Sequence, residues 1–380
     1  MKCFEEKWTK NPQYCEDESE CSRFWEMNNW FADQLITWYL TNKRELPWRE
    51  EKDPYKIWLS EIILQQTQVI QGLGYYQRFV KRFPNVKQLA KASENEVLKM
   101  WEGLGYYSRA RNLHATSKII TNKFKGKFPT EHQQILELKG IGDYTAAAIA
   151  SFAFDLPHAV VDGNVYRVLS RVFGVNTPID SAAGKKEFHE LASALMPKNK
   201  AATFNQAIME FGAQYCKPRV PDCESCIFSR RCFAFATSRV SVLPVKAKKT
   251  KVTKRYFNYL ICIDAGQNLS INKRIEKDIW QGLYEFPLIE SDASLSPSAV
   301  ITGAEKKFKT KGLKKALVFK SGEYKHLLSH QTIYAVFYVF YPVKFTTVLG
   351  ERTTLKKLRS HAFPQLLVKF MKDCELREIV

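Results

Sequence analysis

Between residues 28 and 236, apolar side chains recur every three or four positions, as they do along one face of an α-helix. Successive amphipathic helices are marked by Trp30, Leu35, Trp38 and Tyr39, by Ile57, Ile62, Ile63 and Leu64, and by Leu89, Val97, Leu98 and Trp101. Phe-Pro pairs at 83–84 and 128–129 separate helical stretches, because proline lacks the amide hydrogen of a helix interior. No segment of this half alternates with a period of two, so a mainly helical domain is predicted.

After Ser238 the pattern changes to runs rich in β-branched and aromatic residues. Runs at 256–264, 315–320 and 332–341 predict β-strands, and the segment 363–372 predicts a final helix. The second domain is therefore predicted to be α+β.

These changes divide the chain into four predicted segments. Residues 1–24 predict a poorly structured extension, and residues 25–236 the helical domain. A basic linker at 237–253 leads to the C-terminal domain at 254–380. Six lysines and arginines and no acidic residue lie between Val245 and Tyr256, which predicts an exposed segment, either near a polyanionic partner or simply in solvent.

The charge of the chain bears on its partner. Among 380 residues, the net charge is +19, and the hydrophobic fraction of 45% is ordinary for a globular protein. Such an excess favours nucleic acid, through phosphate contacts and counterion release; a basic protein without such a partner is the alternative. No apolar run approaches the roughly 20 residues of a membrane helix, and the polar first 26 residues do not resemble a signal peptide. We expect no membrane partner and a cytoplasmic location, at the nucleoid in a bacterium.

Four of the nine cysteines lie close together, at Cys216, Cys223, Cys226 and Cys232, with the spacing C-x6-C-x2-C-x5-C. Four thiolates could hold zinc in a tetrahedral structural site or one [4Fe–4S] cluster; buried or disulfide-bonded cysteines are the alternative. Zinc ligands usually come as two close pairs, whereas only the second and third cysteines are a close pair here. With all four ligand positions filled, the metal would be structural, and thiolate ligands suit a reducing compartment.

The stretch 138–146 (LKGIGDYTA) has the pattern of a helix–hairpin–helix. Gly140 and Gly142 flank one apolar residue, and a helix of small residues follows. Glycines permit a tight turn close to a phosphate, and the first N–H groups of the next helix would face that anion. The pattern predicts a DNA contact here; a simple interhelical turn is the alternative.

Two carboxylates lie beside apolar runs. Glu61 should have a raised pKa in such surroundings and could act as a general acid, although a lone glutamate of this kind is more often an exposed helix residue. Asp162 directly precedes a new helix, so it would cap the first backbone amides. A carboxylate at that position could also stabilise a positively charged transition state, and the two roles are compatible.

Two further stretches suit contact with a duplex. Gln65, Gln66 and Thr67 follow the Glu61 run, and because amides can hydrogen-bond base edges, a wedge into the duplex is plausible here. In 103–112 (GLGYYSRARN), the glycines, Tyr106 and Arg109 suit intercalation with phosphate clamping. A helix-connecting turn with packing tyrosines is the alternative.

Taken in order, these motifs resemble those of the MutY-type adenine DNA glycosylases, within the endonuclease III superfamily. The resemblance covers about residues 28–380 and rests on the cysteine loop and on LPWR at 46–49, SEIILQQTQV at 60–69, GLGYYSRARNL at 103–113, LKGIGDYTAAAI at 138–149 and VDGNVYRVLSR at 161–171. It implies a mainly α helix–hairpin–helix glycosylase domain whose four cysteines hold a [4Fe–4S] cluster.

The resemblance also implies roles for single residues. Glu61 matches the acid that protonates adenine at N7, and Asp162, with Asn164 and Tyr144 beside it, matches the carboxylate that stabilises the oxocarbenium ion. In endonuclease III a lysine nucleophile lies two residues past the second hairpin glycine, where this chain has Tyr144. Without that amine, base release should not be accompanied by strand cleavage.

Gln66 and Tyr106 match residues that wedge into the duplex next to the lesion, and the target adenine would have to be flipped out of the stack. The segment 278–287 (DIWQGLYEFP) resembles the Nudix-like C-terminal domain of the family. No Nudix catalytic motif follows, so this domain should not hydrolyse nucleoside diphosphates. Ser329 and His330 match the loop that recognises 8-oxoguanine, with Leu328 in place of the family's frequent phenylalanine.

The sequence therefore predicts a monofunctional adenine DNA glycosylase, acting as a monomer on double-stranded DNA with A·8-oxoguanine or A·G mispairs. Two alternatives remain. One is a related glycosylase for another mismatch, such as thymine opposite guanine. The other is a DNA-binding protein that senses lesions without catalysis.

Overall fold

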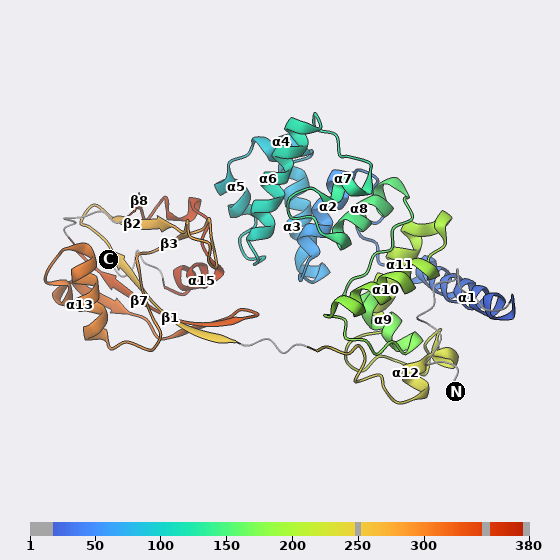
Figure 1. Ribbon diagram of the computed structural model, residues 1–380. Helices are drawn as coiled ribbons and strands as arrows, with labels where there is room; N and C mark the ends of the chain where they lie inside the picture. The colour runs from blue at the N-terminus through green and yellow to red at the C-terminus, as the bar shows by residue number, and fades with distance from the viewer. Residues whose placement is uncertain (1–17, 248–251, 344–349, 375–380) are drawn as a thin grey trace. The chain divides into compact units, whose positions relative to one another are not determined.

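A computed structural model describes residues 18–247, 252–343 and 350–374 (Figure 1). Its internal contacts divide the chain into two compact units, each made of two segments. The first combines Met1–Gln66 with Ile119–Lys248, and the second combines Thr67–Lys118 with Lys249–Val380. Residues 1–17 lie outside the described part, and the first helix already begins at Glu18, inside the stretch expected to be an unstructured extension.

The first unit is helical. Its elements are α1 (Glu18–Asn42), α2 (Pro54–Leu64), α7 (His132–Leu136), α8 (Asp143–Phe154), α9 (Gly163–Phe173), α10 (Ala182–Leu195), α11 (Ala201–Gln214), α12 (Phe233–Ala236) and the 3-10 turns η3 (Lys198–Lys200) and η4 (Ser229–Arg231). One further helix, α6 (Ser108–Lys123), crosses from the second unit into the first. Over its described residues this unit has no β-strand, in agreement with the helical spacing of its apolar residues.

The core of this unit lies among α1, α9, α10 and α11, with α11 packed against both α1 and α9. Phe31 of α1 is fully buried and stacks on Phe228 at a centroid distance of 4.8 Å. Phe204 of α11 packs edge-on against the same ring. Each such buried side chain contributes about 2 kcal/mol. This packing holds the helices of the first unit together, among them α9, which begins after Asp162.

A second group of helices, α2, α7 and α8, contains the hairpin. Asp53 caps α2 by accepting a hydrogen bond from the Tyr55 amide at 2.9 Å, and Pro54 fits the first turn, where no amide partner is needed. The link between α7 and α8 turns at Gly140, whose φ of +78° favours glycine. The helix–hairpin–helix expected from the sequence is therefore formed by α7 and α8.

The second unit combines short helices with two sheets. Its helices are α3 (Val69–Arg82), α4 (Val86–Lys91), α5 (Glu94–Met100), α13 (Pro297–Phe308), α14 (Leu313–Ala316), α15 (Gln365–Asp373) and the 3-10 turn η5 (Leu358–Ser360). Its strands are β1 (Thr253–Cys262), β2 (Asn268–Lys273), β3 (Tyr284–Glu285), β4 (Leu288–Ser291), β5 (Leu317–Lys320), β6 (Tyr324–Leu327), β7 (Gln331–Phe340) and β8 (Glu351–Thr354).

Strands β1 and β7 form the centre of the larger sheet and pair in parallel, from Thr253 opposite Gln331 to Cys262 opposite Phe340 (Figure 1). Strand β4 pairs antiparallel with β1, and β5 and β6 pair antiparallel with β7. The described part of the chain adds a second, smaller antiparallel sheet in the order β3-β2-β8. Helices α13 and α14 pack against the large sheet, with Val300 of α13, Leu313 of α14 and Leu260 of β1 in one apolar cluster.

The strand predictions at 256–264, 315–320 and 332–341 correspond to β1, β5 and β7, and the final helix corresponds to α15. The basic run at 246–255, which was expected to be exposed, differs from this expectation at its C-terminal end. Its lysines Lys248, Lys249 and Lys251 lie outside the described residues, but Arg255 does not face solvent as expected. Its side chain is 19% exposed and forms ion pairs with Asp278 and Glu290, because β1 has already entered the sheet at this point.

Within the described ranges, no helix combines the length and the hydropathy needed to cross a membrane.

Candidate functional site

Glu61 and Tyr144 meet inside the first unit. Glu61 lies near the C-terminal end of α2 and is 7% exposed, in a stripe with Ile62 and Ile63. Tyr144 is the second residue of α8, directly after the hairpin, and its hydroxyl donates a hydrogen bond of 2.6 Å to Glu61 Oε2. The packing of α2 against α8 brings together two residues that are 83 positions apart in the sequence.

Burial changes the acidity of this carboxyl group. Loss of hydration, with a smaller contribution from the negative charge of Asp162, raises the pKa of Glu61 to about 7. The Tyr144 hydrogen bond and the positive charge of Arg49 act in the opposite direction. Glu61 is therefore partly protonated at neutral pH and could donate a proton, whereas an exposed glutamate would be ionised.

Asp162 caps α9. Its Oδ1 accepts hydrogen bonds from the backbone amides of Asn164 and Val165, each at 2.8 Å, and its Oδ2 accepts one from Asn164 Nδ2 at 2.7 Å. Burial raises the pKa of Asp162, while these three hydrogen bonds favour the ionised form. The helix also ends cleanly, at Gly174 with a φ of +75°. The N-cap role expected from the sequence is thus present.

Asn164, which hydrogen-bonds Asp162, is also connected to the cysteine loop through Arg167. Arg167 Nη2 donates to Asn164 Oδ1 at 2.8 Å and to the Gly212 carbonyl at 2.7 Å, and Arg167 Nε donates to the Cys216 carbonyl at 2.8 Å. One turn further along α9, Arg171 Nη1 lies 3.4 Å from the Cys216 sulfur. A single helix therefore joins the Asp162 region to the cysteine loop. Sequence analysis missed Arg167 and Arg171, although their spacing from Asn164 was a usable signal.

The four clustered cysteines are free and half-buried, and together with Arg171 and Phe228 they line one small cavity. Over the described ranges, however, no group of three or more His, Cys, Asp or Glu side chains is arranged to hold a metal ion. Four thiols around one cavity form a donor set whose residue types fit a thiolate-ligated metal or cluster.

Glu210 organises a buried ion cluster in the first unit. It is 1% exposed and bonds Arg44 Nε at 2.7 Å and also Arg49, which belongs to the LPWR stretch. Although burial opposes ionisation, the hydrogen bond from Arg44 and the two positive charges hold the pKa of Glu210 below its usual value. This cluster fixes Arg49 near the Glu61 carboxyl, a role that sequence analysis did not identify.

The residues expected at the DNA surface of the first unit have varied environments. Gly142 is exposed and has an ordinary extended conformation, so only Gly140 needs the conformational freedom of glycine. Gln65 is half-buried and donates a hydrogen bond of 3.2 Å to Thr145 Oγ1. Gln66 is exposed with a φ of +54°, at the tip of the turn after α2. An exposed, left-handed glutamine is suited to a wedge.

Thr67, Tyr106 and Arg109 belong to the second unit. Thr67 lies in the turn before α3, and Tyr106 is 47% exposed with a φ of +46°. Arg109 folds back on its own loop, where its guanidinium lies 5.2 Å from the Trp101 ring and 5.6 Å from the Tyr106 ring. Burial lowers the pKa of Arg109 to about 10. These contacts stabilise the loop that carries Tyr106.

Ser329 and His330 lie in the exposed tight turn between β6 and β7, and their Ser329 Oγ and His330 Nδ1 atoms are 3.2 Å apart. The turn closes through a hydrogen bond from the Leu328 amide to the Gln331 carbonyl at 2.8 Å. In the second unit a cavity of about 510 Å³ is lined by this turn together with residues 103–108 and 278–280. Cavities of this size accept small ligands.

Comparison with known families identifies two matches. The family of HhH-GPD superfamily base excision DNA repair proteins matches residues 59–195, and the NUDIX domain family matches residues 258–373. The two matches coincide with the helical half and with the sheet-containing C-terminal region.

Several relatives carry the name adenine DNA glycosylase. The protein of Buchnera aphidicola subsp. Baizongia pistaciae is 34% identical over 305 residues, which cover 80% of this chain and 84% of the relative. That of Buchnera aphidicola subsp. Schizaphis graminum is 36% identical over 258 residues, covering 68% and 74%. The Arabidopsis thaliana protein is 35% identical over 344 residues, covering 78% of this chain and 54% of the relative.

Two solved structures resemble part of the chain. A thermostable thymine-DNA glycosylase is 32% identical, with a TM-score of 0.52, and the match covers 56% of this chain and 98% of that protein. A trapped endonuclease III–DNA covalent intermediate is 20% identical, with a TM-score of 0.50 and coverages of 56% and 97%; at that identity it shows only a shared fold.

Proposed function

This chain belongs to the adenine DNA glycosylase family, and we propose that it hydrolyses the N-glycosidic bond of adenine mispaired with 8-oxoguanine or guanine. The family membership confirms the resemblance seen in the sequence, the fold class of a helix–hairpin–helix domain followed by a Nudix-like domain, and a DNA glycosylase activity in base excision repair. The hydrogen bond between buried Glu61 and Tyr144 is the observation that carries the proposed mechanism.

In this mechanism Glu61 is the general acid. Its raised pKa, about 7, leaves the proton available at neutral pH, and Tyr144 orients the carboxyl group. The proton goes to adenine N7 while the bond between the sugar C1′ and N9 breaks, and the bonding electrons leave with the base. The flipped nucleotide then carries an oxocarbenium ion at C1′. Water adds at C1′ and returns a proton to the Glu61 carboxylate, which gives an abasic site.

Asp162 stabilises the positive charge at the sugar. Two backbone amides and the Asn164 amide hold its carboxylate in place and favour its ionised form. A fixed negative charge in a site shielded from water stabilises an oxocarbenium ion more strongly than a hydrated one would. Asn164 acts by orienting Asp162.

The reaction ends at the abasic site because the chain has no amine at the position of Tyr144. Burial raises the pKa of Tyr144 well above its usual value, so the phenol stays neutral. A phenol has no amine nitrogen in either protonation state, so it cannot form the Schiff base that strand cleavage by a lyase requires. Tyr144 instead serves the hydrogen bond to Glu61.

Cys216, Cys223, Cys226 and Cys232 would hold a [4Fe–4S] cluster. When bound, such a cluster supplies a covalent cross-link of the loop through four thiolates. The chain's own contribution is the Arg171 guanidinium beside the Cys216 sulfur and the Arg167 hydrogen bond to the Cys216 carbonyl. Both arginines tie the loop to α9.

Recognition of 8-oxoguanine is assigned to the C-terminal region, through Ser329 and His330. Both side chains are exposed in a short turn and offer hydrogen-bonding groups beside the cavity of about 510 Å³. Gln65, Gln66, Thr67, Tyr106, Arg109, Gly140 and Gly142 are the proposed contacts to the duplex. We propose that the enzyme acts as a monomer.

A second candidate is release of thymine opposite guanine. It is favoured by the 32% identity with a thymine-DNA glycosylase over 56% of this chain. That match covers 56% of the chain, whereas three adenine DNA glycosylase relatives cover 68%, 78% and 80% of it. The longer match favours adenine.

Base release from defined duplexes tests the proposal. With adenine opposite 8-oxoguanine, we expect strand breakage only after alkali, and the Glu61→Gln variant should bind the duplex without releasing adenine. Release of thymine but not adenine would support the second candidate instead. Breakage without alkali would contradict the monofunctional mechanism.

A further inference from the structure

The segment Asp278–Gly282, between β2 and β3, carries a tryptophan in an unusual backbone conformation. Trp280 has a φ of +60° and is 9% exposed. A bulky side chain rarely adopts this left-handed region, and such residues persist only where their surroundings hold them. Gly282, with a φ of +86°, completes the turn. The contacts that hold this segment therefore decide where the indole lies.

The indole ring packs between two rings from different strands. It contacts Phe257 of β1 at a centroid distance of 6.0 Å and an interplanar angle of 80°, and His326 of β6 at 5.8 Å and 62°. Both Trp280 and His326 line the cavity of about 510 Å³. One wall of this cavity is therefore an aromatic pair whose geometry depends on the 278–282 segment.

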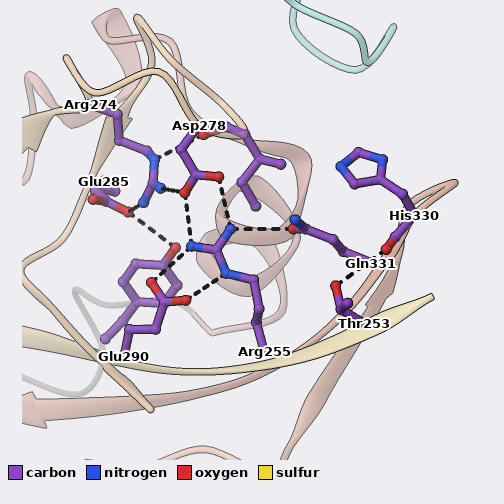
Figure 2. A network of polar contacts seen from close by, with 10 residues as sticks. Thr253, Arg255, Arg274, Asp278, Glu285, Glu290, His330 and Gln331 are labelled. Atoms are coloured by element: carbon purple, nitrogen blue, oxygen red, sulfur yellow. Dashed lines mark hydrogen bonds and ion pairs between the residues drawn. The ribbon is translucent and has the colours of Figure 1, made fainter. Parts of the chain in front are cut away.

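Two arginines, Arg255 and Arg274, hold the segment through Asp278 (Figure 2). Arg255 donates to both oxygens of Asp278, at 2.9 and 2.8 Å, and to Glu290 at 2.5 and 2.9 Å. Arg274 donates to Asp278 Oδ2 at 2.8 Å, to Glu285 Oε2 at 2.7 Å and to the Ile279 carbonyl at 3.0 Å. These hydrogen bonds fix both the carboxylate of Asp278 and the backbone beside Trp280.

The Arg255 guanidinium also contacts the residue that follows the Ser329–His330 turn. Arg255 Nη1 donates to Gln331 Oε1 at 3.3 Å, directly after the Ser329–His330 turn (Figure 2). Thr253 reinforces this connection, since its amide donates to the His330 carbonyl at 3.1 Å. Arg255 thus fixes the Trp280 wall and the Ser329–His330 turn relative to each other.

The network also matters for charge. Asp278 lines the cavity, and an unpaired carboxylate there would repel the phosphates of DNA. Arg255 and Arg274 both pair with it, and Arg255 holds the pKa of Asp278 below its usual value. The two guanidinium groups therefore offset part of the negative charge at this wall, although they also pair with Glu285 and Glu290.

We propose that Trp280, with His326, forms the wall against which the base opposite the excised adenine is read, and that Arg255 and Asp278 are positioning residues for this reading. The inference rests on the proposed function, because it assigns these residues to the same recognition site as Ser329 and His330. Loss of the network should lower discrimination between 8-oxoguanine and guanine without impairing the chemistry at Glu61.

The test is single-turnover adenine release from A·8-oxoguanine and A·G duplexes by the full-length Arg255→Met variant. The ratio of the two rates should fall about tenfold, since a misplacement of roughly 1 Å can cost up to about a hundredfold and the displacement expected here is smaller. The rate on A·G should stay near that of the wild type. Arg352→Met is the matched control: it removes an ion pair with Asp264 in the same domain, away from the cavity, and should leave the ratio unchanged.

Asp278→Asn, which has nearly the same shape, serves as an independent variant should Arg255→Met fold poorly, and it should lower the ratio in the same way. A wild-type ratio in the folded variants, with only a lower melting temperature, would overturn the positioning role while leaving the proposed function intact. A wild-type enzyme with no preference for 8-oxoguanine would instead contradict the recognition site itself, and with it this inference.

Discussion

At the scale of single residues, burial decides the protonation of Glu61. In water this carboxyl group would be ionised at neutral pH, but its burial on α2 raises its pKa to about 7. The neighbouring Asp162 has a raised pKa as well, yet it accepts three hydrogen bonds that favour its charge. The two carboxyl groups therefore differ in environment: Glu61 is suited to donate a proton, and Asp162 is suited to remain ionised and stabilise a positive charge.

The raised pKa of Glu61 predicts the pH profile of base release. Because the protonated form donates the proton, the single-turnover rate should decline as pH rises through about 7, approaching a tenfold decrease per pH unit above it. Rates measured between pH 6 and 9 at saturating enzyme check this. A profile that stays flat over that range would exclude Glu61 as the acid in the rate-limiting step.

Replacing Tyr144 by phenylalanine should move that profile. The phenol hydrogen bond lowers the pKa of Glu61, so its loss should shift the alkaline limb to higher pH, and poorer orientation should reduce the plateau rate. Tyr166→Phe, which removes a phenol that packs against Phe188, is the control and should behave like the wild type. An unshifted limb in the Tyr144 variant would argue against this coupling.

At the scale of elements, α9 joins the proposed catalytic carboxylate to the cysteine loop. Asp162 caps its first turn, Arg167 bridges Asn164 and the Cys216 carbonyl, and Arg171 reaches the Cys216 sulfur. Buried guanidinium groups are stable only when their hydrogen bonds are made, so the loop and the helix must be formed together.

Arg167→Met should therefore slow base release, on the order of tenfold, by freeing Asn164 and so loosening Asp162. Duplex binding should change little, because Arg167 is buried. Single-turnover rates compared with those of Arg230→Met, an exposed arginine near the same loop, test the prediction. Equal rates in the two variants would mean that the bridge does not support the site.

The hairpin between α7 and α8 offers a second test at this scale. Gly140→Ala should lower the free energy of unfolding by about 1 kcal/mol or more, because alanine is strained at a φ of +78°. Gly142→Ala should leave it nearly unchanged, since Gly142 has an extended conformation and a Cβ there would meet nothing within 4 Å. Denaturant unfolding of both variants distinguishes them; equal losses would refute the conformational argument.

At the scale of the whole molecule, charge is the dominant feature. The net charge of +19 is spread over a chain with 58 lysines and arginines, some of which are buried in ion clusters, as Arg255 and Arg274 are. The exposed remainder provides attraction to DNA that does not depend on sequence. Lesion recognition must then come from the few positioned side chains.

This division predicts a strong salt dependence. If about six phosphates are contacted, affinity for any duplex should fall roughly a thousandfold between 50 and 200 mM salt. The ratio of affinities for A·8-oxoguanine and undamaged duplexes should change far less. Titrations of both duplexes at several salt concentrations provide the measurement, and a salt-independent affinity would contradict a phosphate-dominated interface.

Prediction from sequence succeeded where local pattern is sufficient. The apolar spacing of Trp30, Leu35 and Trp38 predicted a helix, and the run around Ile333 predicted β7. The short strands β2, β3, β4, β6 and β8 were not predicted, because each has at most six residues and depends on a partner strand. Arg255 was assigned to solvent because its sequence neighbours are basic, whereas its spatial neighbours are acidic.

The sequence by itself determined the family, the fold class, the hairpin turn at Gly140 and the cap at Asp162, because these depend on motifs of residue type and spacing along the chain. Only the tertiary structure decided that Tyr144 bonds Glu61, that Arg49 lies beside them, and that Arg255 links the Trp280 segment to the Ser329–His330 turn. The physical reason is that desolvation and hydrogen bonding act over a few ångströms in space, between residues that the chain separates by many positions.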